Sequence, residues 1–379
     1  MKIGITCYPT YGGSGAVATE LGIALADRGH EVHFITYRQP FRLPSFLPRV
    51  FFHEVDVGRY PLFEFPPYDL ALAVRMHEVV RTHGLELLHC HYAIPHATSA
   101  WIAREMLRET SEDVHLITTL HGTDITIVGQ DPSFYPITKF SIEKSDRITA
   151  VSEYLRDETI RAFGCAGCEV EVIHNFIDPD IYNREKYPPS LKEQLGRSRP
   201  VLMHVSNFRE VKRVRDVIRV FAEVNKEMPS VLVMIGDGPD RPAAEEEARS
   251  LGVESSVSFL GKLEQIAPLL AAADLFLLPS KSESFGLSAL EALASGVPVI
   301  GTNAGGLPEV IRDGETGVLC GVGDIAGMAA AALGILQDPK RWSAMSRLAI
   351  LDSRQRFSLD AIVGRYEALY RRSLPNTQS

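Results

Sequence analysis

The chain has 379 residues, with 39 Lys and Arg against 48 Asp and Glu, and a formal net charge of −9. This length is too great for one compact core and suits two domains. The acidic balance argues against nucleic acid or an anionic membrane surface as a partner, because either would favour a basic face. No apolar run approaches the ~18 residues that a membrane-spanning helix needs.

Cysteine usage and the first residues predict a cytoplasmic location. The five cysteines are odd in number and scattered, which argues against a disulfide framework. Residues 1–7 are expected to form a strand and no secretory signal, since they lack an apolar core with a cleavage site. Cys165 and Cys168 form a C-x-x-C pair, open to interpretation as a redox centre or half a zinc site. The sequence has no second pair of ligands at the spacing of a zinc site, so we interpret the segment with Cys165 and Cys168 as a surface loop.

Short β-rich runs alternate with helix-length amphipathic segments, which predicts βαβ units and parallel sheets. In the first half we expect helices over 16–28, 70–83 and 97–109, and strands over 2–7, 32–36, 51–55, 87–90, 116–120, 148–151 and 170–173. The second half repeats the plan, with strands over 201–205, 231–235, 257–260, 275–278 and 297–301.

This alternation predicts an α/β protein of two doubly wound, Rossmann-like domains. The first domain is expected over 1–176, a proline-rich linker over 177–200 and the second domain over 201–357. A last helix within 358–379 is expected to pack back on the first domain. Doubly wound domains bind ligands at the carboxyl ends of their strands, so we expect the two crevices to face a shared cleft.

A glycine-rich turn, Gly-Gly-Ser-Gly at 12–15, follows the first strand and opens a helix. Glycine lets a backbone approach a ligand closely, and a helix N-terminus favours an anion. Gly13-x-Gly15-x-x-Ala18 also matches a dinucleotide fingerprint, which leaves an NADP-dependent oxidoreductase as an alternative. The turn is longer than that fingerprint requires, and no ribose-binding acid follows the second strand. Arg38, which follows that strand, could bind a 2′-phosphate, so NADP is disfavoured but stays open.

The second half carries a more specific pattern. Glu283 and Glu291 stand eight residues apart, and the helix expected to begin near Gly286 would offer free N–H groups to a pyrophosphate. The carboxylates suit the hydroxyl groups of a sugar. The alternative is a capped helix with two solvated acids. The segments that follow, Ser-Gly-Val-Pro-Val at 295–299 and Gly-Gly-Leu-Pro-Glu at 305–309, favour the functional interpretation.

Together these segments resemble glycosyltransferase family 4, of GT-B architecture, over essentially the whole chain. The resemblance implies a retaining enzyme that needs no cofactor and no catalytic metal. It also implies that Glu291 binds the donor ribose, that Glu283 binds the transferred sugar, and that the amides of 284–287 bind the diphosphate.

The segment 205–213 (VSNFREVKR) stands where the family carries a basic pair for the diphosphate. Lys212 matches the family lysine, whereas Asn207 stands where many members have arginine. Arg209 or Arg213 is expected to replace that charge or to bind an anionic acceptor, the alternative being a solvated basic turn. His121 follows the strand at 116–120, and the resemblance implies that it contacts the donor sugar. His89, His91 and His96 show no zinc spacing.

The segments Cys-Tyr-Pro at 7–9, His-Tyr-Ala-Ile-Pro-His-Ala at 91–97 and 121–126 (HGTDIT) narrow the resemblance to members that act in bacillithiol biosynthesis. That resemblance implies UDP-N-acetylglucosamine as donor and L-malate as acceptor, and allows a homodimer. The expected catalytic residues are His121, Lys212, Arg209 and Glu283. Nucleotide-sugar binding is expected from Gly13, Ser14, Ser206, Lys212, Glu283, Ser284, Phe285, Gly286, Leu287 and Glu291. Acceptor binding is expected from Ser14, Tyr92, Thr119, Asn207 and Arg209.

Three alternatives stay open. The acceptor could be an inositol phosphate or a growing glycan. A phosphorylated acceptor should, however, need more cations in the first domain than this chain has near its motifs. A nucleotide-sugar epimerase would share the architecture and need no acceptor. An NADP-dependent oxidoreductase would use residues 13–18.

Overall fold

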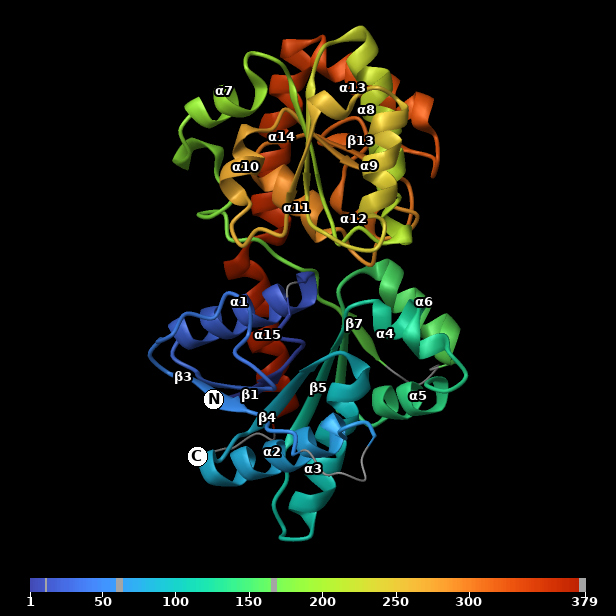
Figure 1. Cartoon of the computed structure of the whole chain (residues 1–379). Coiled ribbons are helices and arrows are strands. Elements are labelled where there is room, and N and C mark those ends of the chain that lie inside the picture. The colour runs from blue at the N-terminus through green and yellow to red at the C-terminus, as the bar shows by residue number, and fades with distance from the viewer. Residues whose placement is uncertain (11, 59–63, 165–168, 375–379) are drawn as a thin grey trace. The chain divides into compact units, whose positions relative to one another are not determined.

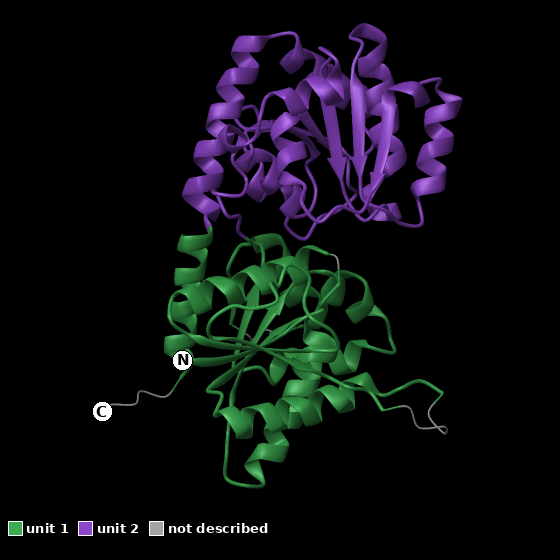
Figure 2. Cartoon of the chain, turned by 60° about the vertical axis from the view of Figure 1, so that its left-hand side comes forward, with its two compact units in different colours: residues 1–175, 359–379 green, residues 176–358 purple. Residues whose placement is uncertain are grey.

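The computed structural model describes residues 1–10, 12–58, 64–164 and 169–374. The chain forms two compact units, the first comprising Met1–Asn175 with Leu359–Ser379 and the second Phe176–Ser358 (Figure 2). Cys165 and Cys168 lie outside the described residues. Within those residues, no helix combines the length and apolar character that crossing a membrane requires.

The first unit is built on a seven-stranded sheet of order β3-β2-β1-β4-β5-β6-β7, with every described pair parallel. Its strands are β1 (Lys2–Thr6), β2 (Glu31–Thr36), β3 (Val50–Glu54), β4 (Leu87–His91), β5 (His115–Leu120), β6 (Arg147–Ala150) and β7 (Val170–Val172). The strand order reverses between β1 and β4. In a doubly wound sheet, ligands bind outside the carboxyl ends of the strands at this switch point.

The helices of the first unit include one from the far end of the chain (Figure 1). They are α1 (Gly13–Asp27), α2 (Tyr68–His83), α3 (Thr98–Arg108), α4 (Thr123–Thr126), α5 (Tyr135–Glu143), α6 (Glu153–Phe163) and α15 (Leu359–Ser373), with short turns η1 (Ala93–Ala97) and η2 (Val128–Gln130). Arg28 and His30, which directly follow α1, both bond to the carboxylate of Glu367 on α15 at 2.7 Å. These bonds join the two ends of the chain.

The second unit repeats the plan with a six-stranded sheet of order β10-β9-β8-β11-β12-β13, again parallel in every described pair. Its strands are β8 (Val201–Val205), β9 (Val231–Ile235), β10 (Val257–Gly261), β11 (Leu275–Leu278), β12 (Val299–Thr302) and β13 (Gly317–Cys320). Its helices are α7 (Ser190–Gly196), α8 (Val214–Glu227), α9 (Arg241–Ser250), α10 (Ala267–Ala272), α11 (Leu287–Ala294), α12 (Leu307–Val310), α13 (Ile325–Leu336) and α14 (Pro339–Phe357), with short turns η3 (Arg184–Lys186), η4 (Glu210–Lys212) and η5 (Glu254–Ser256). The switch point lies between β8 and β11.

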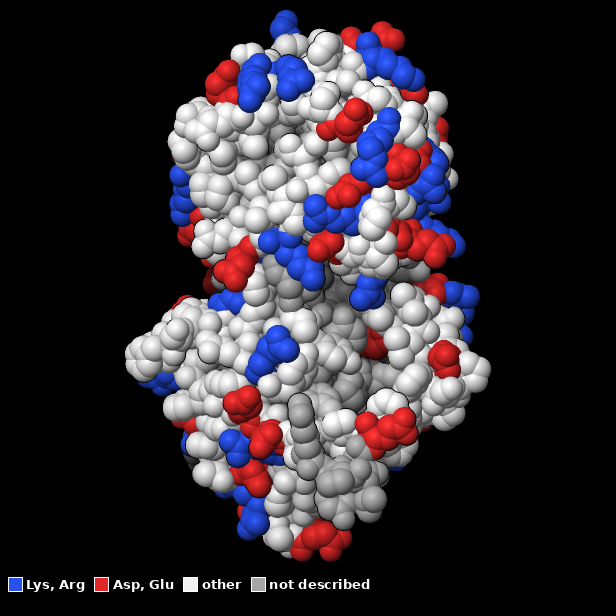
Figure 3. All heavy atoms as spheres, in the orientation of Figure 1, with Lys and Arg blue, Asp and Glu red and all other residues white. Residues whose placement is uncertain are grey.

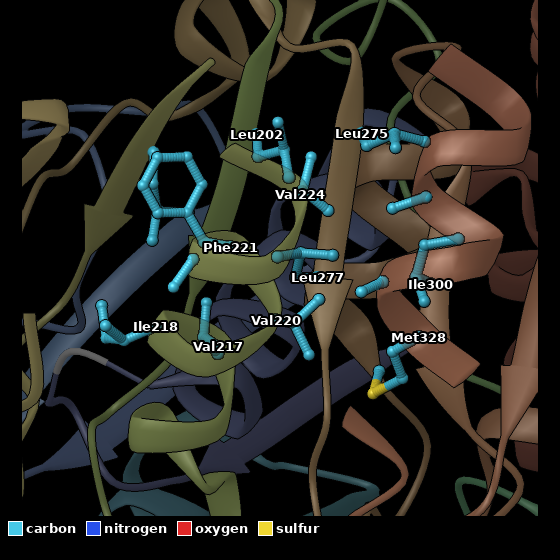
Figure 4. Close-up of a cluster of buried hydrophobic side chains, with 14 of the residues drawn as sticks. Leu202, Val217, Ile218, Val220, Phe221, Val224, Leu275, Leu277, Ile300 and Met328 are labelled. Carbon is cyan, nitrogen blue, oxygen red and sulfur yellow. The ribbon is translucent and has the colours of Figure 1, made fainter. Parts of the chain in front are cut away.

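Helix α8 shows how the sequence pattern builds the core of the second unit (Figure 4). Its buried residues Val217, Val220, Phe221 and Val224 follow the i, i+3, i+4, i+7 spacing of one helix face. That face joins a buried cluster that also contains sheet residues such as Leu202 and Leu277. Burying each such side chain contributes about 1.5–3 kcal/mol, so the cluster fixes the central strands β8 and β11, whose loops carry the predicted site residues.

Two segments differ from the sequence-based prediction. Strand β13 was not predicted, because it is four residues long, largely half-buried, and directly preceded by a turn containing Gly314. The segment 177–200, expected to be a linker, lies within the second unit and contains η3 and α7. Arg184 there donates to the carbonyl of Ala273, and Lys192 pairs with Asp274 at 2.6 Å. The prolines of this segment therefore shape a folded part of the unit.

Charged side chains of both signs are interspersed over the face shown in Figure 3. Many are paired along helices, as in the Lys226–Glu223 and Arg249–Glu246 contacts at 2.7 Å. Such exposed pairs contribute little to stability.

Candidate functional site

The loops after β8 and β11 meet at the switch point of the second sheet. Lys212, at the end of η4 in the β8 loop, places Nζ 2.7 Å from Oε1 of Glu283 in the β11 loop. The Ser280 hydroxyl donates to the same oxygen at 2.8 Å, and the Lys281 amide donates to the Val211 carbonyl at 2.8 Å. The structure thus brings together two residues that the sequence predicted for one site, and side-chain and backbone bonds hold them.

The Gly-Gly-Leu-Pro-Glu segment explains the shape of the loop around Glu283. The Gly306 amide donates to the Glu283 carbonyl at 2.7 Å, and Gly305 adopts a φ of +62°. A Cβ atom at Gly305 would lie 2.2 Å from the Glu283 carbonyl oxygen. Only glycine permits this approach, so the two motifs form one backbone-to-backbone contact.

Helix α11 begins directly after this loop. Gly286 precedes it with a φ of +100°, and a Cβ atom there would lie 2.5 Å from Leu307 Cδ2. Phe285 is buried and packs against Phe357 with ring centroids 5.5 Å apart. The N–H groups of the first helical turn have no partner within the helix, which makes its start suitable for an anion. Ser284, Gly286 and Leu287 therefore stand where the sequence placed them, at a helix start.

Glu283 and Glu291 are both buried, with 9% and 7% of their surface exposed, which rules out the alternative of two solvated acids. The Tyr182 hydroxyl donates to Glu291 Oε1 at 2.6 Å. A buried carboxylate needs such partners. Tyr182 lies in the segment expected to be a linker, so sequence reasoning missed its contribution.

The β8 loop is held close to β9 by two glycines. A Cβ atom at Gly236 would lie 1.8 Å from the Ser206 carbonyl oxygen, and one at Gly238 would lie 2.2 Å from that of Asn207. His204 Nδ1 donates to the Leu277 carbonyl, so its Nε2 accepts from the Ser206 hydroxyl at 2.8 Å. Burial lowers the pKa of His204 to about 4, so the ring is neutral at pH 7. The Ser206 hydroxyl is thus occupied by the protein itself.

The arginines of this loop have different surroundings. Arg213 Nε donates to Asp216 at 2.6 Å. Arg209 and Asn207 are exposed, and no side chain of the described residues pairs with the Arg209 guanidinium. The structure therefore favours Arg209 over Arg213 as the free cation of the loop.

Residues predicted for the site also lie together at the switch point of the first sheet. Ser14, in the first turn of α1, accepts a bond of 3.1 Å from the hydroxyl of Tyr92, which follows β4. A Cβ atom at Gly15 would lie 2.5 Å from the Tyr8 carbonyl oxygen, which explains the glycine there. Tyr92 has a φ of +103°, rare for a residue other than glycine. Gly13 begins α1 and is exposed.

His121 follows β5 and is partly exposed. Its Nε2 lies 2.9 Å from Nδ1 of the buried His91. Burial lowers the pKa of His121 to about 3, with a smaller effect from His96, so the ring is neutral at pH 7. The buried Asp124 carboxylate accepts from the amides of Ala93 and Gly122 at 3.0 Å, which ties the turn after β5 to the turn after β4.

Thr119 does not lie where we expected an acceptor-binding residue. It is fully buried, and its Oγ1 bonds to His89 Nε2 and to Thr149 Oγ1, each at 2.7 Å. His89 Nδ1 in turn lies 2.8 Å from the hydroxyl of Tyr370 on α15. Thr119 points into the core and supports His89, because it stands within the strand and not beyond its end.

Sequence reasoning missed the residues that support the site from a distance. Asp124 and His91 lie inside motifs that had been singled out, so their neighbours gave a signal. No signal in the sequence pointed to Ser280 or Tyr182. Tyr182, for example, reaches Glu291 across 109 positions of the chain.

Comparisons with known proteins place this geometry in a family. Residues 11–181 match the family described as Glycosyltransferase Family 4, and residues 199–338 match Glycosyl transferases group 1. The chain is 47% identical to N-acetyl-alpha-D-glucosaminyl L-malate synthase of Bacillus anthracis over 98% of this chain and 96% of that protein. It is 27% identical to D-inositol 3-phosphate glycosyltransferase 2 of Catenulispora acidiphila over 97% of this chain and 92% of that protein.

Solved structures share the fold at lower identity. Anabaena HepE in complex with UDP and glucose superposes with a TM-score of 0.80 at 21% identity, covering 98% of this chain and 99% of that chain. Sucrose-phosphate synthase from Thermosynechococcus elongatus gives a TM-score of 0.79 at 22% identity, covering 98% of both chains. With two parallel Rossmann-like sheets and these relatives, the chain belongs to the family 4 glycosyltransferases of GT-B fold.

Proposed function

We propose that this glycosyltransferase moves N-acetylglucosamine from UDP-N-acetylglucosamine to the hydroxyl group of L-malate, with retention of the anomeric configuration, as the first step of bacillithiol biosynthesis. The observation that carries the proposal is the 47% identity over 98% of the chain to the malate synthase of Bacillus anthracis. The inositol phosphate glycosyltransferase at 27% identity supports that alternative acceptor less strongly.

The second unit is assigned the donor. The diphosphate would bind at the amides of 284–287 and at Lys212, Glu291 would accept bonds from the ribose, and Glu283 would accept bonds from the sugar. Lys212 is already held by Glu283 at 2.7 Å in this structure. An ammonium group has three donors, so Lys212 can keep this bond and still donate to a phosphate oxygen. A cation fixed before the ligand binds needs no reorganisation when the leaving group gains charge.

Retention follows if the malate hydroxyl attacks from the face on which UDP leaves. The bond from the anomeric carbon to the β-phosphate oxygen breaks as the bond to the malate oxygen forms. The departing phosphate oxygen takes the hydroxyl proton, so no carboxylate base is required. Catalysis is then stabilisation of the diphosphate by Lys212 and by the helix amides.

The acceptor is assigned to Arg209 and Asn207 together with the Ser14–Tyr92 pair of the first unit. Malate carries two carboxylates, and the exposed Arg209 guanidinium can bind one in a bidentate manner. Ser14 accepts from Tyr92 and keeps its own proton for a carboxylate oxygen. His121, neutral and held through Nε2, keeps Nδ1 for the donor sugar.

Two alternatives involve other reactions. An epimerase would consume UDP-N-acetylglucosamine without an acceptor. The oxidoreductase alternative rested on residues 13–18, and membership of the glycosyltransferase family accounts for the same turn without a dinucleotide.

The test is UDP release from UDP-N-acetylglucosamine with no acceptor, with L-malate and with inositol 3-phosphate. The proposal predicts release that depends on malate and is at least tenfold slower with the inositol phosphate. Release that is fastest with the phosphorylated polyol would contradict the acceptor. Conversion of the donor without an acceptor would favour the epimerase.

A further inference from the structure

Three histidines from separate elements of the first unit converge at the edge of its sheet. His33 lies on β2, His53 lies on the edge strand β3, and His83 ends α2. One ring nitrogen of each lies within 4.8 Å of those of the other two. His33 Nδ1 is 2.8 Å from His53 Nε2, and the His83 ring centroid is 4.6 Å from that of His33.

We propose that His33, His53 and His83 bind a single Zn²⁺ ion, with water as the fourth ligand. Imidazole nitrogens suit zinc and its neighbours among the transition metals, whereas Mg²⁺ and Ca²⁺ prefer oxygen. Zinc–nitrogen bonds of about 2.0–2.1 Å in a tetrahedron place the nitrogens about 3.3 Å apart. The three nitrogens lie within 4.8 Å of one another, and those of His33 and His53 are 2.8 Å apart, so side-chain rotations would bring the three rings to that spacing.

The surroundings of His33 match those of a metal ligand. Glu31 Oε1 lies 3.0 Å from His33 Nε2, so the carboxylate keeps the proton on Nε2 and leaves the Nδ1 lone pair for the cluster. Carboxylate–histidine–metal arrangements of this kind are usual around zinc. Lys2 Nζ donates to the His83 carbonyl at 2.8 Å and lies 3.5 Å from Glu31, which fixes the end of α2 beside the same carboxylate.

The arrangement of the three rings also favours a metal. A hydrogen-bonded His33–His53 pair alone would account for neither the third ring nor the carboxylate behind His33.

The position gives the site a structural role. Strand β3 is at the edge of the sheet, and its Phe51 and Phe52 are 43% and 37% exposed. It therefore gains little from apolar burial. A metal ion shared by β2, β3 and the end of α2 would attach this edge strand to the rest of the unit. The site uses none of the residues assigned to the transfer reaction.

The test is zinc content of the full-length protein, first stripped with a chelator, then loaded with Zn²⁺ and dialysed. Wild type is compared with His53→Ala, with His83→Ala and with a matched control, His77→Ala, which removes a histidine of α2 outside the cluster. The proposal predicts about one Zn²⁺ per chain in wild type and control, and at least tenfold weaker binding in the other two. It also predicts that Zn²⁺ at a hundredfold excess over Kd raises the Tm of wild type by roughly 5 °C.

Visible absorption of the Co²⁺-loaded protein checks the geometry, because tetrahedral Co²⁺ absorbs far more strongly than octahedral Co²⁺. The proposal is overturned if stripped wild type retains no Zn²⁺ after dialysis. It is equally overturned if His83→Ala retains as much as the control. His83 is partly exposed at a helix end, so its variant is expected to fold even if His53→Ala does not.

Discussion

Lys212 and Glu283 stand 71 positions apart in the chain and meet with 2.7 Å between Nζ and Oε1. They come from the loops after β8 and β11, the two strands between which the order of the second sheet reverses. In the first sheet, Ser14 and Tyr92 follow β1 and β4 and meet at 3.1 Å. In both units the predicted polar residues therefore lie in the loops at the switch point of the sheet, as expected for doubly wound sheets.

Replacing the Lys212 ammonium tests the role of this pair. We expect Lys212→Ala to lower kcat by ~10²–10³, because one preorganised donor to the leaving diphosphate is lost. The variant also removes one of the two side-chain bonds that the described residues make to the buried Glu283 carboxylate and leaves that of Ser280, so a modest fall in Tm is expected. The matched control is Lys226→Ala, which removes an exposed lysine that pairs with Glu223 on α8. Near-normal kcat in Lys212→Ala, measured by UDP release, would contradict the assignment.

The contact between Gly305 and the Glu283 backbone predicts a steric effect. Gly305→Ala would place Cβ 2.2 Å from the Glu283 carbonyl oxygen, so the loop must move and both Tm and kcat should fall. Gly314→Ala is the control, because Gly314 also has a positive φ of +76° but no atom within 4 Å of the added Cβ. We expect Gly314→Ala to cost about 1 kcal/mol of stability from backbone strain and to leave kcat unchanged. Equal effects of the two variants on kcat would argue against the contact.

Buried neutral histidines predict how stability depends on pH. Burial lowers the pKa of His89 to about 3 and that of His96 to about 4, whereas an unfolded histidine titrates near 6.5. Below pH 6.5 the unfolded chain binds more protons than the folded one. The stability that these groups contribute is therefore present above pH 6.5 and is lost as pH falls toward 4.

We expect each such histidine to reduce the free energy of unfolding by up to about 1.4 kcal/mol per pH unit across that window. His96→Asn keeps a donor for the His91 carbonyl but does not titrate, so its stability should fall less steeply between pH 6 and pH 4.5. Urea unfolding at several pH values measures the slope. A slope identical to that of wild type would show that His96 is not held neutral.

Replacing Arg209 tests whether its side chain binds the acceptor. If its guanidinium binds a malate carboxylate, Arg209→Ala should raise the KM for malate at least tenfold, because a charge-assisted bond contributes about 1.5–3 kcal/mol. The KM for UDP-N-acetylglucosamine should change little. Arg249→Ala, which removes an exposed arginine of α9 paired with Glu246, is the control. An increase confined to the KM for the donor would instead indicate that Arg209 binds the diphosphate.

The glycine motifs made much of the second-unit site predictable. Gly286 and Gly305 are required by a positive φ or by a close backbone contact, and such requirements leave a local mark in the sequence. The strand alternation likewise predicted the parallel sheets, because buried parallel strands form short apolar runs.

Contacts between distant parts of the chain left no such mark. Tyr182 supports Glu291 from a segment whose prolines resemble those of a linker, and nothing local distinguishes a folded proline-rich segment from an extended one. Thr119 was misplaced because a residue one position from the end of a strand can still point into the core. The three histidines of the edge site lie on separate elements and form no spacing motif.

The reaction product distinguishes the proposed donor, acceptor and stereochemistry in one measurement. UDP-N-acetylglucosamine and L-malate are incubated with the enzyme, and the product is identified by mass spectrometry and by the anomeric proton coupling in NMR. We expect N-acetylglucosaminyl malate with the α configuration of the donor retained. A β-linked product would contradict retention, and the absence of any malate glycoside would contradict the proposed acceptor.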